Sequence, residues 1–199
     1  MENIHPIFDK ILDRQAKEKL LNQYSVIVWM VGLSGSGKST IAQNLEKKLY
    51  DAGFATMLLD GDNVRSGLNN NLSFTEEDRQ ENQRRVAEVA KLFMNAGLVT
   101  LCSFVSPTYE AREKVKAIIG PDNFLEVYVE CSFDACARRD VKGLYAKALN
   151  GEIKNFTGLD APFEKPKEPW LTLNTEEHTI EESVNTLFNK LIEKIRYSA

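Results

Sequence analysis

A run of glycine, serine and lysine carries the first chemical signal in this chain. Residues 32–40 read Gly-Leu-Ser-Gly-Ser-Gly-Lys-Ser-Thr and fit G-x-x-x-x-G-K-[ST], the phosphate-binding P-loop. An apolar run precedes it at 26–31, and apolar residues at helical spacing follow it at 41–45. Glycines let backbone amides wrap a polyphosphate closely at the start of a helix. The pattern and its context predict a nucleoside triphosphate site rather than a flexible linker.

Two residues of this loop have the most defined chemistry. Lys38 is predicted to reach the β- and γ-phosphates as a catalytic cation, and the Ser39 hydroxyl is predicted to ligate Mg²⁺. Successive backbone N–H groups would point at the other phosphate oxygens. The residues that we expect to hold the triphosphate are therefore Gly32, Leu33, Ser34, Gly35, Ser36, Gly37, Lys38, Ser39 and Thr40.

Two carboxylates, Asp60 and Asp62, follow the strand predicted at 55–60, with one glycine between them. An Asp-Gly turn would have the same sequence, but the P-loop upstream favours a functional pair. The strand predicted at 98–104 ends without an aspartate, so the usual metal-side carboxylate is missing there. We assign Asp60 to the Mg²⁺ side and Asp62 to the acceptor hydroxyl as its base or orienter. The sequence leaves the reverse assignment open.

Basic, amide and aromatic side chains follow the carboxylate pair. Arg79 and Asn82 lie three residues apart in the helix predicted at 76–96, so they share a helix face. Together with Arg65 they suit a second anionic ligand, and Phe74 offers an aromatic face to a base. Taken alone, Phe74 would more often be a core residue. The set indicates a second ligand that carries an anionic group and a base.

Composition limits the class of protein. With 199 residues and a formal net charge of −4, we expect one α/β domain and no general attraction to nucleic acid. Three cysteines without C-x-x-C spacing favour a reducing compartment over a disulfide scaffold or a zinc site. No stretch reaches the roughly 20 apolar residues of a membrane helix, and the first residues do not resemble a signal peptide. We therefore expect a cytoplasmic protein with no membrane partner.

Strand-like and helix-like segments alternate along the chain. Strands are predicted at 25–31, 55–60, 98–104, 124–130 and 170–174, and helices at 38–51, 76–96, 109–119, 133–139 and 178–197. The alternation predicts an α/β fold of the three-layer P-loop NTPase type, with a parallel five-stranded sheet and helices on both faces. Such sheets bind ligands beyond the carboxyl ends of their strands, which is where the residues named above fall.

Two segments depart from this alternation. Residues 7–23 are predicted to form an amphipathic helix within an N-terminal extension, 1–24, that precedes a single P-loop domain at 25–199. Residues 138–169 contain several glycines and prolines and have no clear periodicity. Long insertions in compact domains are usually functional or disordered. A mobile lid is therefore favoured over a plain surface excursion.

Taken together, these motifs resemble the adenylyl-sulfate kinase (APS kinase) family of P-loop kinases. The resemblance lies in 32–40, Leu59-Asp60-Gly61-Asp62-Asn63-Val64-Arg65, Phe74-Thr75, Asp78-Arg79, Glu81-Asn82, Arg84-Arg85 and Ser103-Phe104-Val105-Ser106-Pro107. It continues in Arg139-Asp140-Val141-Lys142-Gly143-Leu144-Tyr145, Lys147-Ala148 and Phe156-Thr157-Gly158, with Pro162 and Pro166 after them. Other P-loop kinases share only the first motif, so the combination is specific.

The resemblance implies transfer of the ATP γ-phosphoryl group to the 3′-hydroxyl of adenosine 5′-phosphosulfate. The products would be 3′-phosphoadenosine 5′-phosphosulfate and ADP, in sulfate assimilation, with Mg²⁺ accompanying ATP. It also implies roles for the acceptor residues. Arg65, Arg79 and Asn82 would hold the phosphosulfate, Phe74 and Phe156 would sandwich the adenine, and Val105, Ser106 and Leu144 would line the pocket.

By the same resemblance, Lys142, Arg138 and Arg139 belong to the lid that closes over the transferring phosphate, with Lys142 in a catalytic role. Asn174 and Thr175 would lie near the ATP adenine. ATP and adenosine 5′-phosphosulfate are the expected small-molecule partners. A homodimer and a functional association with an ATP sulfurylase stay open.

Two other functions compete with this interpretation. The nearest is another small-molecule P-loop kinase, acting on a nucleoside monophosphate, shikimate or gluconate, which the aromatic and basic acceptor set disfavours. A non-catalytic, nucleotide-dependent regulatory module is more remote. Its guanine signature Asn-Lys-x-Asp is absent, because 189–190 is followed by leucine and isoleucine. A nucleic-acid-binding role is disfavoured by the acidic balance.

Overall fold

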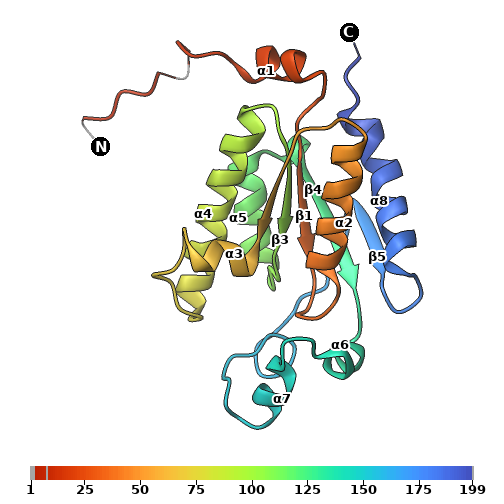
Figure 1. Cartoon of the computed structure of the whole chain (residues 1–199). Coiled ribbons are helices and arrows are strands. Elements are labelled where there is room, and N and C mark those ends of the chain that lie inside the picture. Colours follow the sequence, from red (N-terminus) through yellow and green to blue (C-terminus); the bar gives the residue numbers. More distant parts are fainter. Residues whose placement is uncertain (1–2, 8, 199) are drawn as a thin grey trace.

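The computed structural model describes residues 3–7 and 9–198, which form a parallel sheet between two layers of helices (Figure 1). The strands are β1 (Ile27–Val31), β2 (Thr56–Asp60), β3 (Val99–Ser103), β4 (Phe124–Glu130) and β5 (Leu171–Asn174), in the order β2-β3-β1-β4-β5. α2 (Lys38–Asp51) and α8 (Ile180–Ile195) cover one face, and α4 (Glu76–Asn95) and α5 (Tyr109–Ile119) cover the other. The predicted fold class and all five predicted strands are confirmed.

β1 lies in the middle of the sheet and is buried on both faces. Val28 and Met30 join the apolar cluster under α2 and α8, whereas Ile27 and Trp29 join the cluster under α4 and α5. Successive side chains of a strand point to opposite faces, so a strand covered on both sides reads as an unbroken apolar run. The P-loop begins directly at the end of this run.

The N-terminal helix is shorter than predicted. α1 spans Arg14–Leu21 instead of 7–23, and 9–13 form a turn and irregular chain. Asp13 sets the start, because its carboxylate accepts a hydrogen bond from Ala16 N at 2.8 Å as an N-cap. Asn22 ends the helix in the left-handed conformation, with φ of 53°. Residues 1, 2, 8 and 199, which belong to the predicted extension and domain, lie outside the described residues.

Two short helices are absent from the predicted elements: α3 (Gly61–Ser66) and α7 (Leu144–Leu149). α3 starts directly at the end of β2, because the Asp60 carboxylate caps it by accepting from Asp62 N at 3.1 Å. The Asp140 carboxylate likewise accepts from two N–H groups in the first turn of α7, each at 3.0 Å. Each helix has six residues, which is too few to produce the apolar period that sequence analysis relies on.

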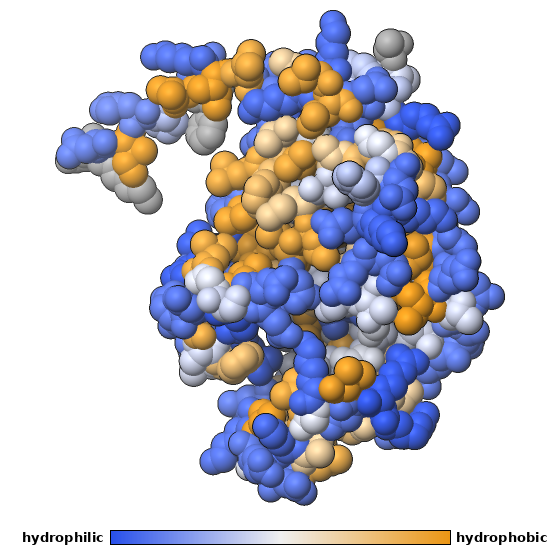
Figure 2. Space-filling model, viewed as in Figure 1, coloured by the Kyte–Doolittle hydropathy of each residue, from blue (hydrophilic) through white to orange (hydrophobic). Residues whose placement is uncertain are grey.

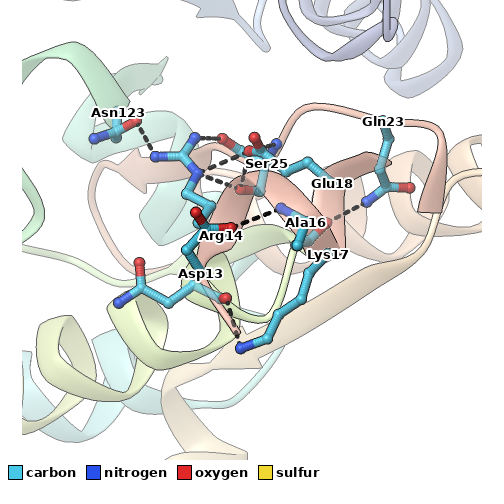
Figure 3. Close-up of polar contacts among 10 residues, drawn as sticks. Asp13, Arg14, Ala16, Lys17, Glu18, Gln23, Ser25 and Asn123 are labelled. Atoms are coloured by element: carbon cyan, nitrogen blue, oxygen red, sulfur yellow. Dashed lines mark hydrogen bonds and ion pairs between the residues drawn. The ribbon is translucent and has the colours of Figure 1, made fainter. Parts of the chain in front are cut away.

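α1 is joined to the amino end of the sheet by a buried carboxylate (Figure 3). Glu18 accepts hydrogen bonds from Ser25 N at 2.8 Å and Ser25 Oγ at 2.6 Å, and its Oε1 lies 2.7 Å from Arg14 Nε. Arg14 also donates to Asn123 Oδ1 at 2.7 Å. Burial opposes the charge on Glu18, but the hydrogen bonds from Ser25 and Arg14 prevail and lower the pKa of its carboxyl. The network therefore ties α1 to the residues that precede β1 and β4.

Gln23 extends this connection to two further strands. Its buried side chain donates from Nε2 to Ala55 O at 2.9 Å and to Gly97 O at 2.8 Å, and its Oε1 accepts from Ala55 N at 2.7 Å. Ala55 precedes β2, and Gly97 lies just before β3. α1 and Gln23 together hold the amino ends of four strands, at the opposite end of the sheet from the P-loop (Figure 1).

The segment after β4 forms a separate lobe beyond the carboxyl ends of the strands (Figure 1 and Figure 2). It contains α6 (Phe133–Arg139) and α7, and the chain then runs without further regular helix or strand until β5. Its own small apolar cluster includes Cys136, Tyr145 and Phe156, together with Leu33 of the P-loop. The lobe therefore packs against the phosphate-binding loop itself.

Apolar side chains gather along the N-terminal arm and on the side of the molecule where α4 lies (Figure 2). Ile4, Ile7 and Leu12 are exposed on the arm, and Leu92 is exposed on α4. None of the helices in the described part of the chain combines the length and the apolar character needed to cross a membrane.

Replacing Glu18 by alanine is predicted to lower the free energy of unfolding by about 2–3 kcal/mol, because Ser25 and Arg14 lose a buried acceptor. The measurement is urea denaturation followed by circular dichroism. Glu88→Ala is the control, since Glu88 is exposed on α4 and its loss should change the free energy by no more than about 0.5 kcal/mol. Equal effects of the two substitutions would contradict the role given to the Glu18 network.

Candidate active site

The P-loop turns closely around the end of β1. Gly32 has φ of 153°, and a Cβ there would lie 2.5 Å from Val129 O of the neighbouring strand β4. Gly37 has φ of 102° and is the N-cap of α2. Both positions need glycine, the first because of close packing and the second because of its left-handed backbone. The loop therefore delivers the first N–H groups of α2 to the carboxyl edge of the sheet, as predicted for a phosphate site.

Lys38 is buried beneath this loop. Its Nζ donates to Gly32 O at 2.9 Å and to Leu33 O at 2.8 Å, so the ammonium group is held by the loop's own carbonyls. Burial lowers the pKa of Lys38 to about 8, and the positive charge of Lys142 lowers it as well. A phosphate near Nζ would stabilise the charged form of Lys38, so electrostatics favour binding of an anion here.

Ser39 and Asp60 meet at the carboxyl ends of the strands. Ser39 Oγ donates to Asp60 Oδ2 at 2.6 Å, and Ser103 Oγ lies 3.3 Å from Ser39 Oγ. Asp60 is the register partner of Ser103 in the pairing of β2 with β3. The structure thus brings the two residues predicted to hold Mg²⁺ within hydrogen-bond distance, and it adds the hydroxyl of Ser103, which sequence analysis missed.

Asp62 has a different partner from Asp60. It lies in the first turn of α3, is exposed, and forms an ion pair with Lys142 of the lobe that contains α7. The two residues are 80 positions apart in the sequence. The two carboxylates of the Asp-Gly-Asp segment therefore differ in their surroundings, because Asp60 binds the P-loop serine and Asp62 binds the lobe.

Arg65, Phe74 and Arg79 form a second cluster beside α3 and α4. The Arg65 guanidinium carbon lies 4.3 Å from the centre of the Phe74 ring, and that of Arg79 lies 5.8 Å from it. Burial lowers the pKa of both arginines, and the charge of Arg79 lowers that of Arg65 further. Within residues 3–7 and 9–198 neither arginine has a carboxylate within ion-pair distance. Two neighbouring cations without such a counterion have the chemistry to bind an anion.

Arg79 also joins the cluster to the lobe. It donates to Phe74 O at 3.0 Å, to Asn155 O at 2.8 Å and to Thr157 Oγ1 at 3.0 Å. The last two residues flank Phe156. One guanidinium therefore bonds to Phe74 and to both sequence neighbours of Phe156, the two aromatic residues predicted to bind adenine. Phe74 is exposed, whereas the Phe156 ring is mostly buried, with its centre 4.8 Å from that of Tyr145 in an edge-on contact.

The remaining predicted acceptor residues have different degrees of exposure. Asn82 is buried on α4, and its Oδ1 accepts from Asn69 Nδ2 at 2.9 Å. Ser106 is buried in a left-handed conformation, with φ of 43°, and its Oγ lies 2.9 Å from the indole Nε1 of Trp29. Val105 and Leu144 are partly exposed, the first next to Ser106 and the second at the start of α7.

The predicted ATP-side residues divide into two groups. Arg139 donates to Thr175 Oγ1 at 3.1 Å and to Thr175 O at 2.7 Å, and Thr175 Oγ1 in turn lies 3.0 Å from Ser36 O of the P-loop. Arg139, Thr175 and the P-loop are therefore contiguous. Arg138 is exposed, and Asn174 ends β5, where its Oδ1 accepts from Glu176 N at 3.0 Å.

Asp160 is a further residue of the site that sequence analysis missed. Its carboxylate accepts from Asn155 N at 2.7 Å and from Phe156 N, which holds Asn155 in a left-handed conformation with φ of 57°. Aspartates often accept hydrogen bonds from the backbone of a neighbouring turn. The local sequence does not predict, however, that the turn held by Asp160 is the one that contains Phe156.

A family model described as adenylylsulphate kinase matches residues 24–174 of the chain. The chain belongs to the adenylylsulphate kinase family. An adenylyl-sulfate kinase from Bacteroides fragilis (strain YCH46) is 55% identical over 193 residues, which is 97% of this chain and 96% of that protein. Another from Clostridium kluyveri is 52% identical over 186 residues, with 94% of this chain and 93% of that protein covered.

A solved structure supports the same assignment. The APS kinase CysC of Mycobacterium tuberculosis, in complex with AMPPNP and APS, is 42% identical to this member of the adenylylsulphate kinase family, with a TM-score of 0.82. The comparison covers 84% of this chain and 98% of that one. The family assignment makes the chain an ATP-dependent kinase and sets aside the gluconate, shikimate and non-catalytic alternatives.

The affinity for ATP is predicted to weaken as the pH rises above about 8, the pKa of Lys38 in the free protein. Bound phosphate raises that pKa, so below pH 8 Lys38 is protonated in both states and binding is independent of its titration. Above pH 8 binding must take up a proton, and the dissociation constant should rise by up to about tenfold per pH unit. Titration with a fluorescent ATP analogue between pH 7.5 and 9.5 measures this effect.

Lys38→Met is the matched variant for that titration, because methionine has no charge to lose. It should bind the analogue more weakly at pH 7.5, with a dissociation constant that stays nearly constant with pH. A variant whose affinity falls with pH as steeply as that of the wild-type protein would show that another group is responsible.

Proposed function

We propose that this chain transfers the γ-phosphoryl group of ATP to the 3′-hydroxyl of adenosine 5′-phosphosulfate, giving 3′-phosphoadenosine 5′-phosphosulfate and ADP. The observation that carries the proposal is the pair of anion sites under one lobe. The P-loop with Lys38 suits the triphosphate, and Arg65 and Arg79 beside Phe74 suit a second nucleotide with an anionic group. A simple hydrolase would have no use for the second site.

The donor side fits a magnesium ion. Ser39 and Asp60 offer a hydroxyl and a carboxylate at one point beside the P-loop, and Mg²⁺ prefers oxygen ligands from one or two side chains together with substrate phosphates. We propose that these two residues hold Mg²⁺ with ATP, where the ion would neutralise charge on the β- and γ-phosphates. No cluster of three or more His, Cys, Asp or Glu side chains suited to a metal occurs in the described part of the chain.

The different surroundings of the two aspartates support separate roles. Asp60 is engaged with Ser39 and caps α3, whereas Asp62 is exposed and paired with Lys142. We therefore assign Asp62 to the acceptor: its carboxylate accepts the proton of the 3′-hydroxyl or orients that hydroxyl in line with the γ-phosphorus. The charge of Lys142 acts on Lys38 of the P-loop, and in this proposal it stabilises negative charge on the transferring group once the substrates separate it from Asp62.

Residues 138–169 act in this proposal as a lid. Its contacts with the body include exposed polar pairs, such as Lys142–Asp62 and Arg139–Thr175, and the apolar cluster that packs on Leu33 of the P-loop. The exposed pairs contribute little to stability, so the cost of opening the lid lies mainly in separating this apolar cluster from the P-loop. When closed, it excludes water from the phosphoryl group and favours transfer over hydrolysis.

The proposal also places the protein in a reducing, cytoplasmic compartment. Cys102, Cys131 and Cys136 are all free thiols and all buried. Proteins that work in oxidising compartments more often pair their cysteines.

The reaction is tested by following ADP release from MgATP with a panel of acceptors. We expect turnover with adenosine 5′-phosphosulfate, and at least tenfold lower kcat/KM with AMP, because the two arginines favour the acceptor with the larger anionic group. No reaction is expected with gluconate or shikimate. Preference for AMP, or release of ADP at the same rate without an acceptor, would contradict the proposed function.

Asp62→Asn is predicted to lower kcat by about 10²–10⁴-fold at saturating substrates, as expected for loss of a general base. Asp60→Asn should instead raise the Mg²⁺ concentration needed for half-maximal rate, because asparagine is a weaker ligand. Asp51→Asn, an exposed substitution at the far end of α2, serves as the control. Wild-type turnover in Asp62→Asn would remove the assignment of the base.

A further inference from the structure

A pair of buried amides lies behind the acceptor site. Asn69 is fully buried in the turn between α3 and α4, and Asn82 is buried on α4 itself. Asn69 Nδ2 donates to Asn82 Oδ1 at 2.9 Å. Both backbone groups of Asn69 are hydrogen-bonded, which fixes its position in the turn. Its N–H donates to Val64 O at 2.9 Å, and its carbonyl oxygen accepts from Leu72 N at 3.1 Å.

The direction of this hydrogen bond is set by charged neighbours. Arg85 NH1 lies 3.4 Å from Asn69 Oδ1, and Arg85 Nε is paired with Glu81 at 2.8 Å. An arginine can only donate, so it holds the oxygen end of the Asn69 amide. The NH₂ end of Asn69 is then left to face Asn82. Arg85 thus donates to both Glu81 and Asn69, and Asn69 in turn donates to Asn82.

The two ends of a primary amide have opposite chemistry, since the oxygen accepts and the NH₂ group donates. With its oxygen bound by Asn69, Asn82 can present only its NH₂ group to a ligand. Within residues 3–7 and 9–198, Asn82 Nδ2 has no hydrogen-bond partner. It is not fully enclosed by the protein either, since it is absent from the buried side-chain atoms that lack a partner. Asn82 lies one helical turn from Arg79, on the same side of α4.

We propose that Asn69 is a positioning residue that makes Asn82 a hydrogen-bond donor to the anionic 5′ group of the acceptor. The inference rests on the proposed function, because it takes the acceptor to be a nucleotide whose anionic group meets Arg65 and Arg79. Rotation of the Asn82 amide by half a turn would place a partially negative oxygen against that group. Asn69 therefore helps to determine selection for an anionic acceptor without touching it.

Asn69→Asp tests this role with almost no change in volume. A carboxylate at position 69 has no hydrogen to donate, so it accepts from Asn82 Nδ2, turns the amide and pairs with Arg85. We expect the KM for adenosine 5′-phosphosulfate to rise about 10- to 100-fold, the range for a hydrogen bond to a charged group. The KM for ATP and the kcat should stay within about twofold, because no hydrogen bond in the described part of the chain joins this turn to the P-loop or to Asp62.

Adenosine provides the readout that separates positioning from general damage. It shares the nucleoside but lacks the 5′ anion, so its inhibition constant as a competitor of the acceptor should be unchanged in Asn69→Asp. Asn71→Ala is the matched control. Asn71 is exposed in the same turn and accepts from the same Arg85 NH1 at 2.9 Å, but it has no hydrogen bond to Asn82. Its acceptor KM should equal that of the wild-type protein.

Two outcomes overturn the proposal: an unchanged acceptor KM in Asn69→Asp, or equal rises in the acceptor KM and the adenosine inhibition constant. If Asn69→Asp shows no cooperative thermal unfolding, Asn69→Ala carries the test. It frees the Asn82 amide to rotate, and the acceptor KM should rise several-fold with the adenosine constant unchanged; no rise would overturn the proposal. Absence of turnover in the wild-type protein would instead refute the proposed function.

Discussion

The parallel pairing of β2, β3 and β1 is the constraint on which the site depends. Parallel strands end at one edge of a sheet, so segments distant in the sequence emerge side by side. Here β1 delivers the P-loop, and the register of β2 with β3 sets Asp60 opposite Ser103. Ser39 then reaches Asp60 with a single hydrogen bond. The far end of the sheet is held by α1 and Gln23, which tie the starts of four strands.

Around this edge Lys38, Arg65 and Arg79 bring positive charge to the two predicted anion sites. Lys38 is buried against carbonyl groups, burial lowers the pKa of Arg65 and Arg79, and the positive charge of Arg79 lowers the pKa of Arg65 further. Substrate anions relieve this repulsion, so binding free energy is available on both sides of the reaction centre. The lobe that we propose as a lid connects the two sides, because Arg79 binds its 155–157 turn and its own Arg139 binds the loop after β5.

The site residues that can be predicted from the sequence are those that belong to short motifs of consecutive residues. The P-loop has a fixed spacing, and Asp60 follows an apolar run that is typical of a strand, so the amino-acid pattern alone is enough to place both. Helix α3 and the turn that holds Asn69 could not be predicted, because six-residue helices and irregular turns have no apolar period. The amide pair of Asn69 and Asn82 depends on how that turn folds back on α4.

The contacts between residues 138–169 and the rest of the protein could not be predicted from the sequence either. Lys142 and Asp62 were both expected in the site, but their pairing joins residues 80 positions apart through a segment with little regular structure. The length of α1 was overestimated, because the cap at Asp13 outweighs the weak apolar spacing before it. Local propensity thus placed the elements, and long-range hydrogen bonds decided how the site residues face one another.

If the two anion sites bring a γ-phosphoryl group to the ribose of a second nucleotide, the new phosphate must appear on the acceptor's 3′-hydroxyl. Phosphorus-31 magnetic resonance of a reaction with MgATP and adenosine 5′-phosphosulfate detects it. We expect a new phosphomonoester signal coupled to the 3′ proton of the acceptor ribose, rising in step with ADP. Phosphorus appearing only as inorganic phosphate, or attached at any other position of the acceptor, would contradict it.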